Sequence, residues 1–363
     1  MNILAVGVSL PGILRSQAEL LDELSKAWGD KVTERERTLL ERLAKSAGVK
    51  TKHLAMNPNE YGECRSFTSR NAVFKKVGKE LAEKAVAAAC EQAGLSPSLL
   101  DAIFFTTVTG IVVPSLDTMI AGPLKFREDI KRVPMFGLGC VAGAAGLARV
   151  HDYLKAYPQQ AAVLLSVELC SLTLQLDDLS IESIVSSALF GDGSAAVVCV
   201  GDEHPLAGKG KLRTLASKSR LYPDSAHIMG WDVGSHGFKI LLDPGVPKIV
   251  ETYFADDVKK FLAQSNLAVS DITSWISHPG GPKVLKAIES CLELPTGALA
   301  ISWGQLESLG NMSSASVLSI LRATIERRDL APRDANYKVS GNALIMAMGP
   351  GFCAELVLCQ WTH

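Results

Sequence analysis

The stretch VPMFGLGCVAGAAGLARVHDYL (133–154) joins an apolar run to a series of small residues around a single cysteine, Cys140. After the small residues, Leu147, Val150 and Leu154 recur with the i, i+3, i+7 spacing of an amphipathic helix. We therefore expect Cys140 where a strand ends and a buried helix begins. A thiol at a helix N-terminus feels the positive end of the helix dipole, which favours the thiolate. The alternative is a packed core cysteine, because unpaired cysteines are among the most buried residue types.

The composition is that of a globular protein. The chain has 363 residues, of which 47% are hydrophobic and 21% charged, with a formal net charge of −1. This is enough for one large domain or two fused halves. We expect no nucleic-acid partner, because there is no basic run, and no membrane span, because no uninterrupted apolar stretch reaches about 18 residues. The apolar N-terminus (1–14) lacks a preceding basic segment, so it predicts a buried strand and not a signal peptide.

The eight cysteines are irregularly spaced, and no two of them form a C-x-x-C pair. This spacing in a long chain does not predict a disulfide framework, and the lack of paired cysteines argues against a zinc site. We therefore expect reduced thiols, no bound metal and a cytoplasmic location.

Helical and extended segments alternate along the chain, which predicts an α/β fold. The segments expected to be helical are 17–50, 72–93, 282–294 and 312–328, and those expected to contain strands are 101–110, 161–170, 187–200, 272–281 and 343–361. The strand at 161–170 is apolar without alternation, as is typical of a strand buried on both faces.

Each half of the chain closes with the same local motif. Residues 191–196 (GDGSAA) and 349–354 (GPGFCA) both read G-x-G-x-x-A before an apolar strand. This echo indicates two similar α/β halves, each with a layered sheet between helices. We assign residues 1–205 to the N-terminal half and 206–363 to the C-terminal half, with the boundary in a polar segment.

Two further polar residues are candidates to act with Cys140. His278 follows a predicted strand in WISHPGGPKVL, and Asn311 follows Gly310 before a predicted helix. A surface turn histidine and an N-cap asparagine are the structural alternatives. A cysteine nucleophile needs a base or a cation, and histidine and amide N–H groups can form an oxyanion hole. Because these residues come from both halves, we expect the site at their junction.

Five motifs together carry a family resemblance: GLGCVAG around Cys140, ALFGDGSAA (188–196), SHPGGPKVL (277–285), GNMSSASV (310–317) and GPGF (349–352). With them the chain resembles, nearly end to end, the type III polyketide synthases, the chalcone synthase-like family of the thiolase superfamily. The resemblance implies a thiolase-like fold with αβαβα layers. It also implies an acyltransferase that works as a homodimer, takes acyl-CoA and malonyl-CoA, and needs no metal or added cofactor.

The resemblance also implies roles for individual residues. Cys140 accepts the acyl group, while His278 and Asn311 promote malonyl decarboxylation and stabilise the enolate for a decarboxylative Claisen condensation. The residues implied to contact substrate are the gatekeepers Phe190 and Phe238, the wall loop Gly349, Pro350 and Gly351, the cavity residues Ser313 and Thr173, and Arg42 and Lys45 near the coenzyme A phosphates. The alternatives are core packing for the two phenylalanines and a solvated helix face for the two cations.

The starter is predicted from the cavity stretch TTVTGIVVPSLD (106–117), which offers the aliphatic residues Val108, Val112 and Val113. Hydrophobic walls suit an alkyl chain, and the stretch 140–154 resembles bacterial alkylresorcinol and alkylpyrone synthases. We therefore expect a long-chain fatty acyl starter and an alkylpyrone or alkylresorcinol product. The alternatives are a malonyl-only tetrahydroxynaphthalene synthase, a single-round β-ketoacyl synthase, and a non-catalytic binding protein of the same fold.

Overall fold

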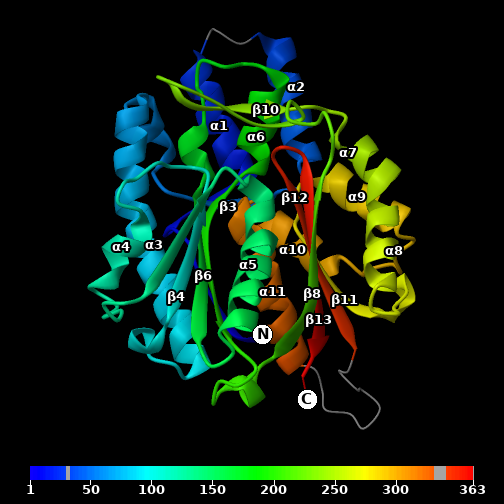
Figure 1. Ribbon diagram of the computed structural model, residues 1–363. Coiled ribbons are helices and arrows are strands. Elements are labelled where there is room, and N and C mark those ends of the chain that lie inside the picture. Colours follow the sequence, from blue (N-terminus) through cyan, green and yellow to red (C-terminus); the bar gives the residue numbers. More distant parts are fainter. Residues whose placement is uncertain (30–32, 331–340, 363) are drawn as a thin grey trace.

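The computed structural model describes residues 1–29, 33–330 and 341–362. Its large sheet contains β1 (Asn2–Ser9), β4 (Ala102–Thr107), β5 (Lys131–Phe136), β6 (Ala161–Leu169), β7 (Asp192–Val200), β8 (Leu212–Leu221), β11 (Ile272–Ser277), β12 (Asn342–Gly349) and β13 (Cys353–Trp361). These nine strands follow the order β11-β12-β13-β8-β1-β7-β6-β4-β5 (Figure 1). Two small two-stranded antiparallel sheets pair β2 (Ile13–Ser16) with β3 (Thr51–Leu54) and β9 (Met229–Gly234) with β10 (Gly237–Leu242).

The two halves of the large sheet repeat one pattern of strand pairing. In the N-terminal half β4 and β6 are parallel, and β6–β7 and β7–β1 are antiparallel. In the C-terminal half β11 and β12 are parallel, and β12–β13 and β13–β8 are antiparallel. A short pairing of β1 with β8 joins the halves. The prediction of two similar halves is therefore confirmed, while the boundary at 205/206, between β7 and β8, stays a prediction.

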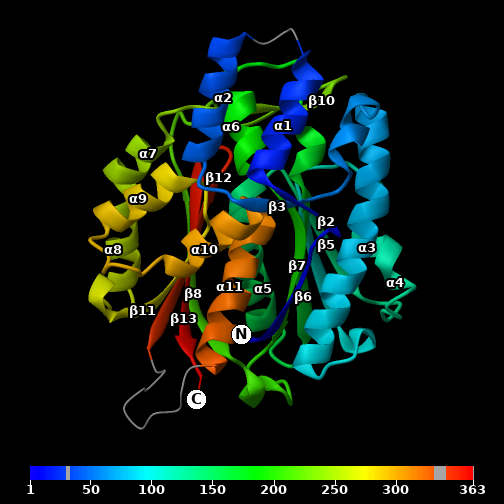
Figure 2. The same ribbon diagram turned by 180° about the vertical axis from the view of Figure 1, so that it is seen from behind.

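Helices form three layers around the two halves of the sheet (Figures 1 and 2). The central layer is α5 (Ala142–Ala156) and α11 (Ser314–Asp329), which share one hydrophobic core with strands of both halves. The helix α3 (Phe67–Ala93) covers the outer face of the N-terminal half, and α8 (Ala255–Ala263) and α9 (Pro282–Cys291) cover that of the C-terminal half. The expected αβαβα arrangement is confirmed.

Strand alternation divides the apolar residues among these layers. In β12, Ala343 and Ile345 join the central core, whereas Leu344 and Met346 join the outer core with α9. The remaining helices are α1 (Gln17–Trp28), α2 (Glu34–Ser46), α4 (Leu116–Ala121), α6 (Ile181–Leu189), α7 (Val246–Ile249) and α10 (Ala300–Leu309). None of the helices in the described ranges has the length and apolarity needed to cross a bilayer.

The small residues after Cys140 allow α5 to lie close to its neighbours. A Cβ added to Gly143 would lie 2.3 Å from the Ser314 carbonyl oxygen, and one added to Gly146 would lie 2.5 Å from Leu164 Cδ1. Real Cβ atoms do not approach other atoms so closely, so only glycine fits at Gly143, against a backbone oxygen, whereas a larger residue at Gly146 would require the Leu164 side chain to move. The small-residue run therefore fixes the distance between the two central helices.

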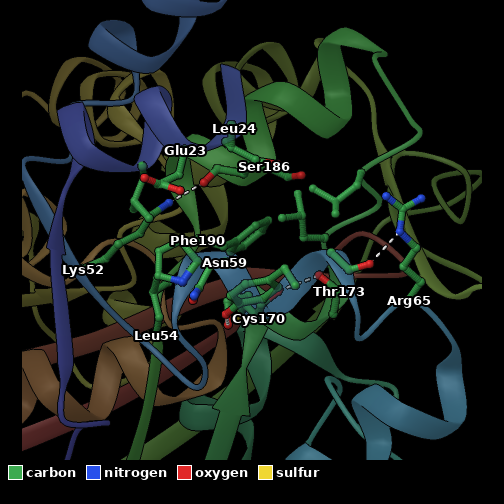
Figure 3. A pocket seen from close by; sticks show the side chains of 18 of the residues that line it. Glu23, Leu24, Lys52, Leu54, Asn59, Arg65, Cys170, Thr173, Ser186 and Phe190 are labelled. Carbon is green, nitrogen blue, oxygen red and sulfur yellow. Dashed lines mark hydrogen bonds between the residues drawn. The ribbon is translucent and has the colours of Figure 1, made fainter. Parts of the chain in front are cut away.

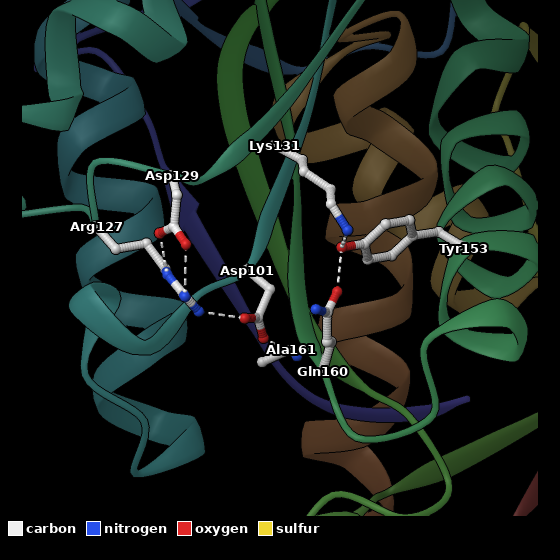
Figure 4. A network of polar contacts seen from close by, with 7 residues as sticks. All are labelled: Asp101, Arg127, Asp129, Lys131, Tyr153, Gln160 and Ala161. Carbon is white, nitrogen blue, oxygen red and sulfur yellow. Dashed lines mark hydrogen bonds and ion pairs between the residues drawn. The ribbon is translucent and has the colours of Figure 1, made fainter.

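A polar network anchors the strand that leads to Cys140 (Figure 4). Arg127, just before β5, pairs with Asp101, whose other carboxylate oxygen accepts a 2.8 Å hydrogen bond from the Ala161 N–H. Lys131 at the start of β5 donates to Tyr153 Oη of α5 at 3.2 Å. These contacts tie β5 to β4, β6 and α5, so the turn that follows β5 has a defined position.

Candidate active site

Cys140 lies at a strand-to-helix junction, as the sequence predicts. A 3₁₀ turn over Gly139–Val141 separates β5 from α5. A Cβ added to Gly139 would lie 2.6 Å from Pro350 Cδ, and one added to Gly349 would lie 2.6 Å from the Val141 nitrogen. The predicted wall loop therefore packs directly against the turn that carries Cys140. Its third member, Gly351, has φ +79° in the connection from β12 to β13.

Asn311 and Ser313 lie beside the thiol, just before α11. Cys140 Sγ donates to Ser313 Oγ across 3.7 Å. The Ser313 N–H donates to Asn311 Oδ1 at 2.8 Å, while Ser313 itself has φ +49°. Because its carbonyl oxygen is engaged by the backbone, Asn311 is left with its amide N–H groups as donors toward the site. Asn311 is therefore not the N-cap of α11, a position that Ser313 occupies.

His278 follows β11 and is only 4% exposed. Its backbone N–H donates to the Met346 carbonyl of β12 at 2.9 Å. Further along the same strand Gly349 abuts the Cys140 turn, so His278 lies toward the end of the sheet that holds the thiol. Both ring nitrogens are buried without a hydrogen-bond partner among the described residues. Buried polar groups are normally hydrogen-bonded, so the ring can accept a partner supplied by a ligand.

Burial shifts the pKa of both the Cys140 thiol and the His278 imidazole. It raises the pKa of Cys140 to about 12, against smaller opposing effects of the Ser313 and Asn311 hydrogen bonds. It lowers the pKa of His278 to about 3. Desolvation of the buried thiol thus opposes the expected effect of the helix start, and the thiolate stays a prediction. Attraction between a thiolate and an imidazolium would oppose both shifts, so proton transfer from Cys140 to His278 requires their close approach.

The two predicted gatekeepers belong to one row of aromatic rings. Phe190 follows α6, and its ring centroid lies 6.4 Å from that of Trp231. Trp231 lies 6.2 Å from Phe238, which in turn meets Phe67 edge-on at 5.5 Å. Such pairs stabilise one another beyond their buried area. Trp231 was not predicted as a site residue, although it lies between the two that were.

A cavity of about 400 Å³ opens beside Phe190 (Figure 3). Its wall combines leucines with polar and charged groups from α1, β3, α6 and the segments around 58–65 and 170–176. Of the predicted substrate residues, Phe190 and Thr173 line it. The lining residues that the sequence did not indicate include Glu23, Leu24, Lys52, Leu54, Asn59, Arg65, Cys170 and Ser186.

Two family descriptions match the chain, one after the other. Residues 1–203 match chalcone and stilbene synthases, N-terminal domain, and residues 214–361 match chalcone and stilbene synthases, C-terminal domain. The chain belongs to this family. It is therefore a type III polyketide synthase, an acyltransferase that works by decarboxylative Claisen condensation. The predicted family is confirmed, and the alternative of a non-catalytic binding protein is wrong.

Two relatives and one crystal structure show which members of the family the chain is similar to. The synthase is 46% identical to a 1,3,6,8-tetrahydroxynaphthalene synthase of Streptomyces peucetius subsp. caesius, over 99% of this chain and 93% of that protein. It is 29% identical to a phloroglucinol synthase of Pseudomonas fluorescens, over 96% and 95% of the two chains. The crystal structure of 1,3,6,8-tetrahydroxynaphthalene synthase from Streptomyces coelicolor A3(2) superimposes with a TM-score of 0.91 at 29% identity, covering 100% of both chains.

The residues expected to define an alkyl-binding wall do not line this cavity. Val113 is 91% exposed on the surface of the single chain, so it does not line this chain's own interior. Val108 is buried, but neither it nor Val112 is among the lining residues in the described part of the synthase. This cavity therefore gives no support to the valine-lined alkyl wall that was expected from the sequence.

The two cations expected to meet coenzyme A lie outside the cavity wall. Arg42 and Lys45 are exposed on α2, and neither belongs to the described lining. Their contact with the coenzyme A phosphates stays a prediction. Within the described ranges, no cluster of three or more His, Cys, Asp or Glu side chains could hold a metal ion.

A buried carboxyl group near the thiol was missed by the sequence analysis. Glu168 of β6 accepts hydrogen bonds from Ser314 Oγ, from Thr109 Oγ at 3.0 Å and from the Val108 N–H at 3.1 Å. Burial raises its pKa to about 7, with these hydrogen bonds opposing. The signal was present in the sequence, since Glu168 is the one charged residue in the apolar strand AAVLLSVEL.

Proposed function

We propose that this polyketide synthase uses malonyl-CoA as both starter and extender and makes tetrahydroxynaphthalene. The observation that carries the proposal is the 46% identity to the tetrahydroxynaphthalene synthase of Streptomyces peucetius subsp. caesius along 99% of this chain. The structural match to the Streptomyces coelicolor enzyme of the same name supports it. This reading replaces the long-chain fatty acyl starter and the alkylpyrone or alkylresorcinol product.

The character of the cavity agrees with the proposal. A growing poly-β-keto chain carries a carbonyl at every second carbon, so it needs hydrogen-bonding partners along its length. Leu54, Leu174 and Phe190 are interspersed in the wall with Lys52, Asn59 and other polar residues. The wall thus supplies hydrogen-bonding groups that such a chain can use.

The proposed cycle begins when the Cys140 thiol attacks the thioester carbonyl of malonyl-CoA. His278 takes the thiol proton, and the coenzyme A thiolate leaves and receives it, which gives a malonyl thioester on Cys140. The direct contact between Cys140 and Ser313, and the Asn311 amide beside them, support this position for the nucleophile.

A second malonyl-CoA then loses carbon dioxide to form an enolate. The developing negative charge lies on the thioester oxygen, where N–H groups of His278 and Asn311 stabilise it. The enolate carbon attacks the thioester carbonyl on Cys140, a new carbon–carbon bond forms, and the Cys140 thiolate leaves. The extended chain returns from coenzyme A to Cys140 for further rounds. When it finally cyclises, the carboxylate that the malonyl starter brought leaves as carbon dioxide, which gives the carbon count of tetrahydroxynaphthalene. The unpartnered ring nitrogens of His278 support its role as a donor here.

We propose that the enzyme is a cytoplasmic homodimer that works on coenzyme A thioesters without metal or added cofactor. The edge strand β5 supports a partner surface, because its Val133 and Phe136 are exposed, the latter at 56%. Ile111 and Val113, in the loop after the neighbouring β4, are exposed as well. Analytical ultracentrifugation of the purified protein tests this, and a monomer at micromolar concentration would contradict it.

The experiment that tests the function is mass spectrometry of products from the purified enzyme. One reaction receives malonyl-CoA alone, and others receive added acetyl-CoA, a long-chain acyl-CoA or p-coumaroyl-CoA. We expect tetrahydroxynaphthalene, or the quinone formed from it in air, from malonyl-CoA alone. Product only in the presence of long acyl starters would restore the alkylpyrone reading. A linear β-ketoacyl product would instead support the single-round synthase.

A further inference from the structure

We propose that Lys52 binds the free carboxylate of the malonyl starter unit once chain growth has moved it into the cavity beside Phe190. Because of this contact, the enzyme would favour a charged malonyl starter over a neutral acyl starter. This inference rests on the proposed function, and it assigns a residue to the selection of the starter.

The position of Lys52 is unusual for a lysine. It lies on β3, is 3% exposed, and contributes to the cavity wall near Ser186 and Phe190 (Figure 3). Its ammonium group has three N–H donors. One of them is directed to the backbone carbonyl of Ser187. In the described ranges it forms no ion pair with a carboxylate, although a buried lysine normally has one.

The nearby carboxyl group of Asp192 is already occupied. It accepts hydrogen bonds from the Ala55 N–H at 2.7 Å, from the Ser171 N–H at 2.7 Å and from the Ser171 hydroxyl at 2.5 Å. Asp192 is therefore not a direct partner of Lys52. Its charge acts through space and raises the pKa of Lys52. The remaining ammonium donors are open to a ligand in the cavity.

The other charged residues of the cavity wall form ion pairs. Glu23 pairs with Lys26 at 3.2 Å, and Arg65 pairs with Asp177 at 3.4 Å. Lys52 is thus the cation of this wall that lacks a carboxylate among the residues described. Burial lowers its pKa to about 8, which leaves it mostly charged at neutral pH. A buried charge without a partner is costly, so an anionic ligand at this point is favoured.

The direction of chain growth brings the starter end toward this lysine. Each condensation inserts its new carbons next to the Cys140 thioester, so the starter end moves away from the thiol. The wall of the cavity includes Phe190, whose backbone is paired with that of Asn311 beside Cys140. A malonyl starter carries a carboxylate on its far end, whereas an acetyl starter has a methyl group there. An ammonium group in the cavity therefore distinguishes the two.

The test is a competition between starters in one reaction. Lys52→Met, Lys52→Arg and wild-type enzyme receive malonyl-CoA together with ¹³C-labelled acetyl-CoA, and mass spectrometry counts labelled and unlabelled product. Lys26→Met, which removes an exposed cation from the same cavity, is the matched control. Loss of a charged hydrogen bond predicts that the acetyl-primed to malonyl-primed ratio rises at least about tenfold in Lys52→Met. We expect Lys52→Arg and Lys26→Met to stay near the wild-type ratio.

The ratio is measured within each sample, so a loss of folded protein does not change it. An unchanged ratio in Lys52→Met, whether total activity falls or not, would overturn the inference and leave Lys52 with a structural or coenzyme A-binding role. An equal rise in Lys26→Met would also overturn it, because general electrostatics would then explain the effect. If the wild-type enzyme makes no product from malonyl-CoA alone, the proposed function itself fails, which is a distinct result.

Discussion

Phe190 and Asn311 are joined through their backbones by an isolated parallel β-bridge. The Asn311 N–H donates to the Leu189 carbonyl at 2.9 Å, and the Gly191 N–H donates to the Asn311 carbonyl at 3.0 Å. One residue comes from the N-terminal half and the other from the C-terminal half. This bridge joins the backbone of the predicted gatekeeper to that of the predicted oxyanion-binding residue, so a shift of either backbone should move both.

Gly310 is the residue on which this bridge depends. It has φ +69° and ψ −171°, a conformation that only glycine adopts readily, and an added Cβ would lie 2.8 Å from the Leu189 carbonyl oxygen. Gly310→Ala should cost about 1–3 kcal/mol of unfolding free energy. It should also lower kcat by displacing Asn311. Urea unfolding and product formation at saturating malonyl-CoA measure the two effects.

Gly304→Ala, in the exposed part of α10, is the control for Gly310→Ala. A Cβ there meets no atom within 4 Å, so helix propensity should leave stability unchanged or raise it by up to about 1 kcal/mol. Equal unfolding free energies for the two variants would show that the bridge does not need a glycine.

Cys140→Ala should abolish product formation, because no other described thiol is in contact with Ser313 next to Asn311. Intact-protein mass spectrometry should find no malonyl or polyketide adduct on this variant. The matched control is Cys291→Ala in α9, which removes a half-buried thiol far along the chain from the cavity. An adduct on Cys140→Ala, or product at the wild-type rate, would remove Cys140 from the role of nucleophile.

Asn311→Ala should impair malonyl decarboxylation more than loading. The amide is proposed to stabilise the enolate, and loss of one such donor typically lowers a rate about 100- to 1,000-fold. Release of labelled carbon dioxide measures decarboxylation, and adduct formation on Cys140 in a single turnover measures loading. Equal losses in the two steps would argue that Asn311 only positions Ser313, to which its Oδ1 is bonded.

The parts of the fold that the sequence predicted depend on local patterns. The turn at Cys140 and the helix after it follow from glycine, small residues and an apolar period, and these same features fix the close contact of α5 with α11. The paired G-x-G-x-x-A motifs reflect the antiparallel strands β7 and β13, which occupy equivalent places in the two halves. Short-range sequence patterns were therefore sufficient to predict the helices and strands and the similarity of the two halves.

The cavity and the ionisation of the site depend on distant contacts that local patterns do not contain. Lys52, Arg65, Cys170 and Phe190 meet only because β3, α6 and two loops converge. The direction in which the pKa of Cys140 shifts depends on how completely the folded chain excludes water from the thiol. No local motif specifies this. Val113 looked like a wall residue because it is aliphatic, yet its loop projects it outward.

Glu168 should make the enzyme less stable as pH rises from 5 to 8. Its folded-state pKa is raised from 4.5 to about 7, so the folded state holds the proton more tightly than the unfolded state. The resulting stabilisation is complete below pH 4.5 and is lost as pH rises through 7, by on the order of 3 kcal/mol.

Glu168→Gln keeps the shape and an acceptor for Thr109 and Val108 but does not titrate. Relative to this variant, wild type should lose unfolding free energy between pH 5 and pH 8, as measured by urea titration. Glu91→Gln, on the exposed face of α3, is the control. Parallel pH profiles for wild type and Glu168→Gln would mean that Glu168 titrates alike in both states, and that its hydrogen bonds with Ser314 and Thr109 offset the whole cost of its burial.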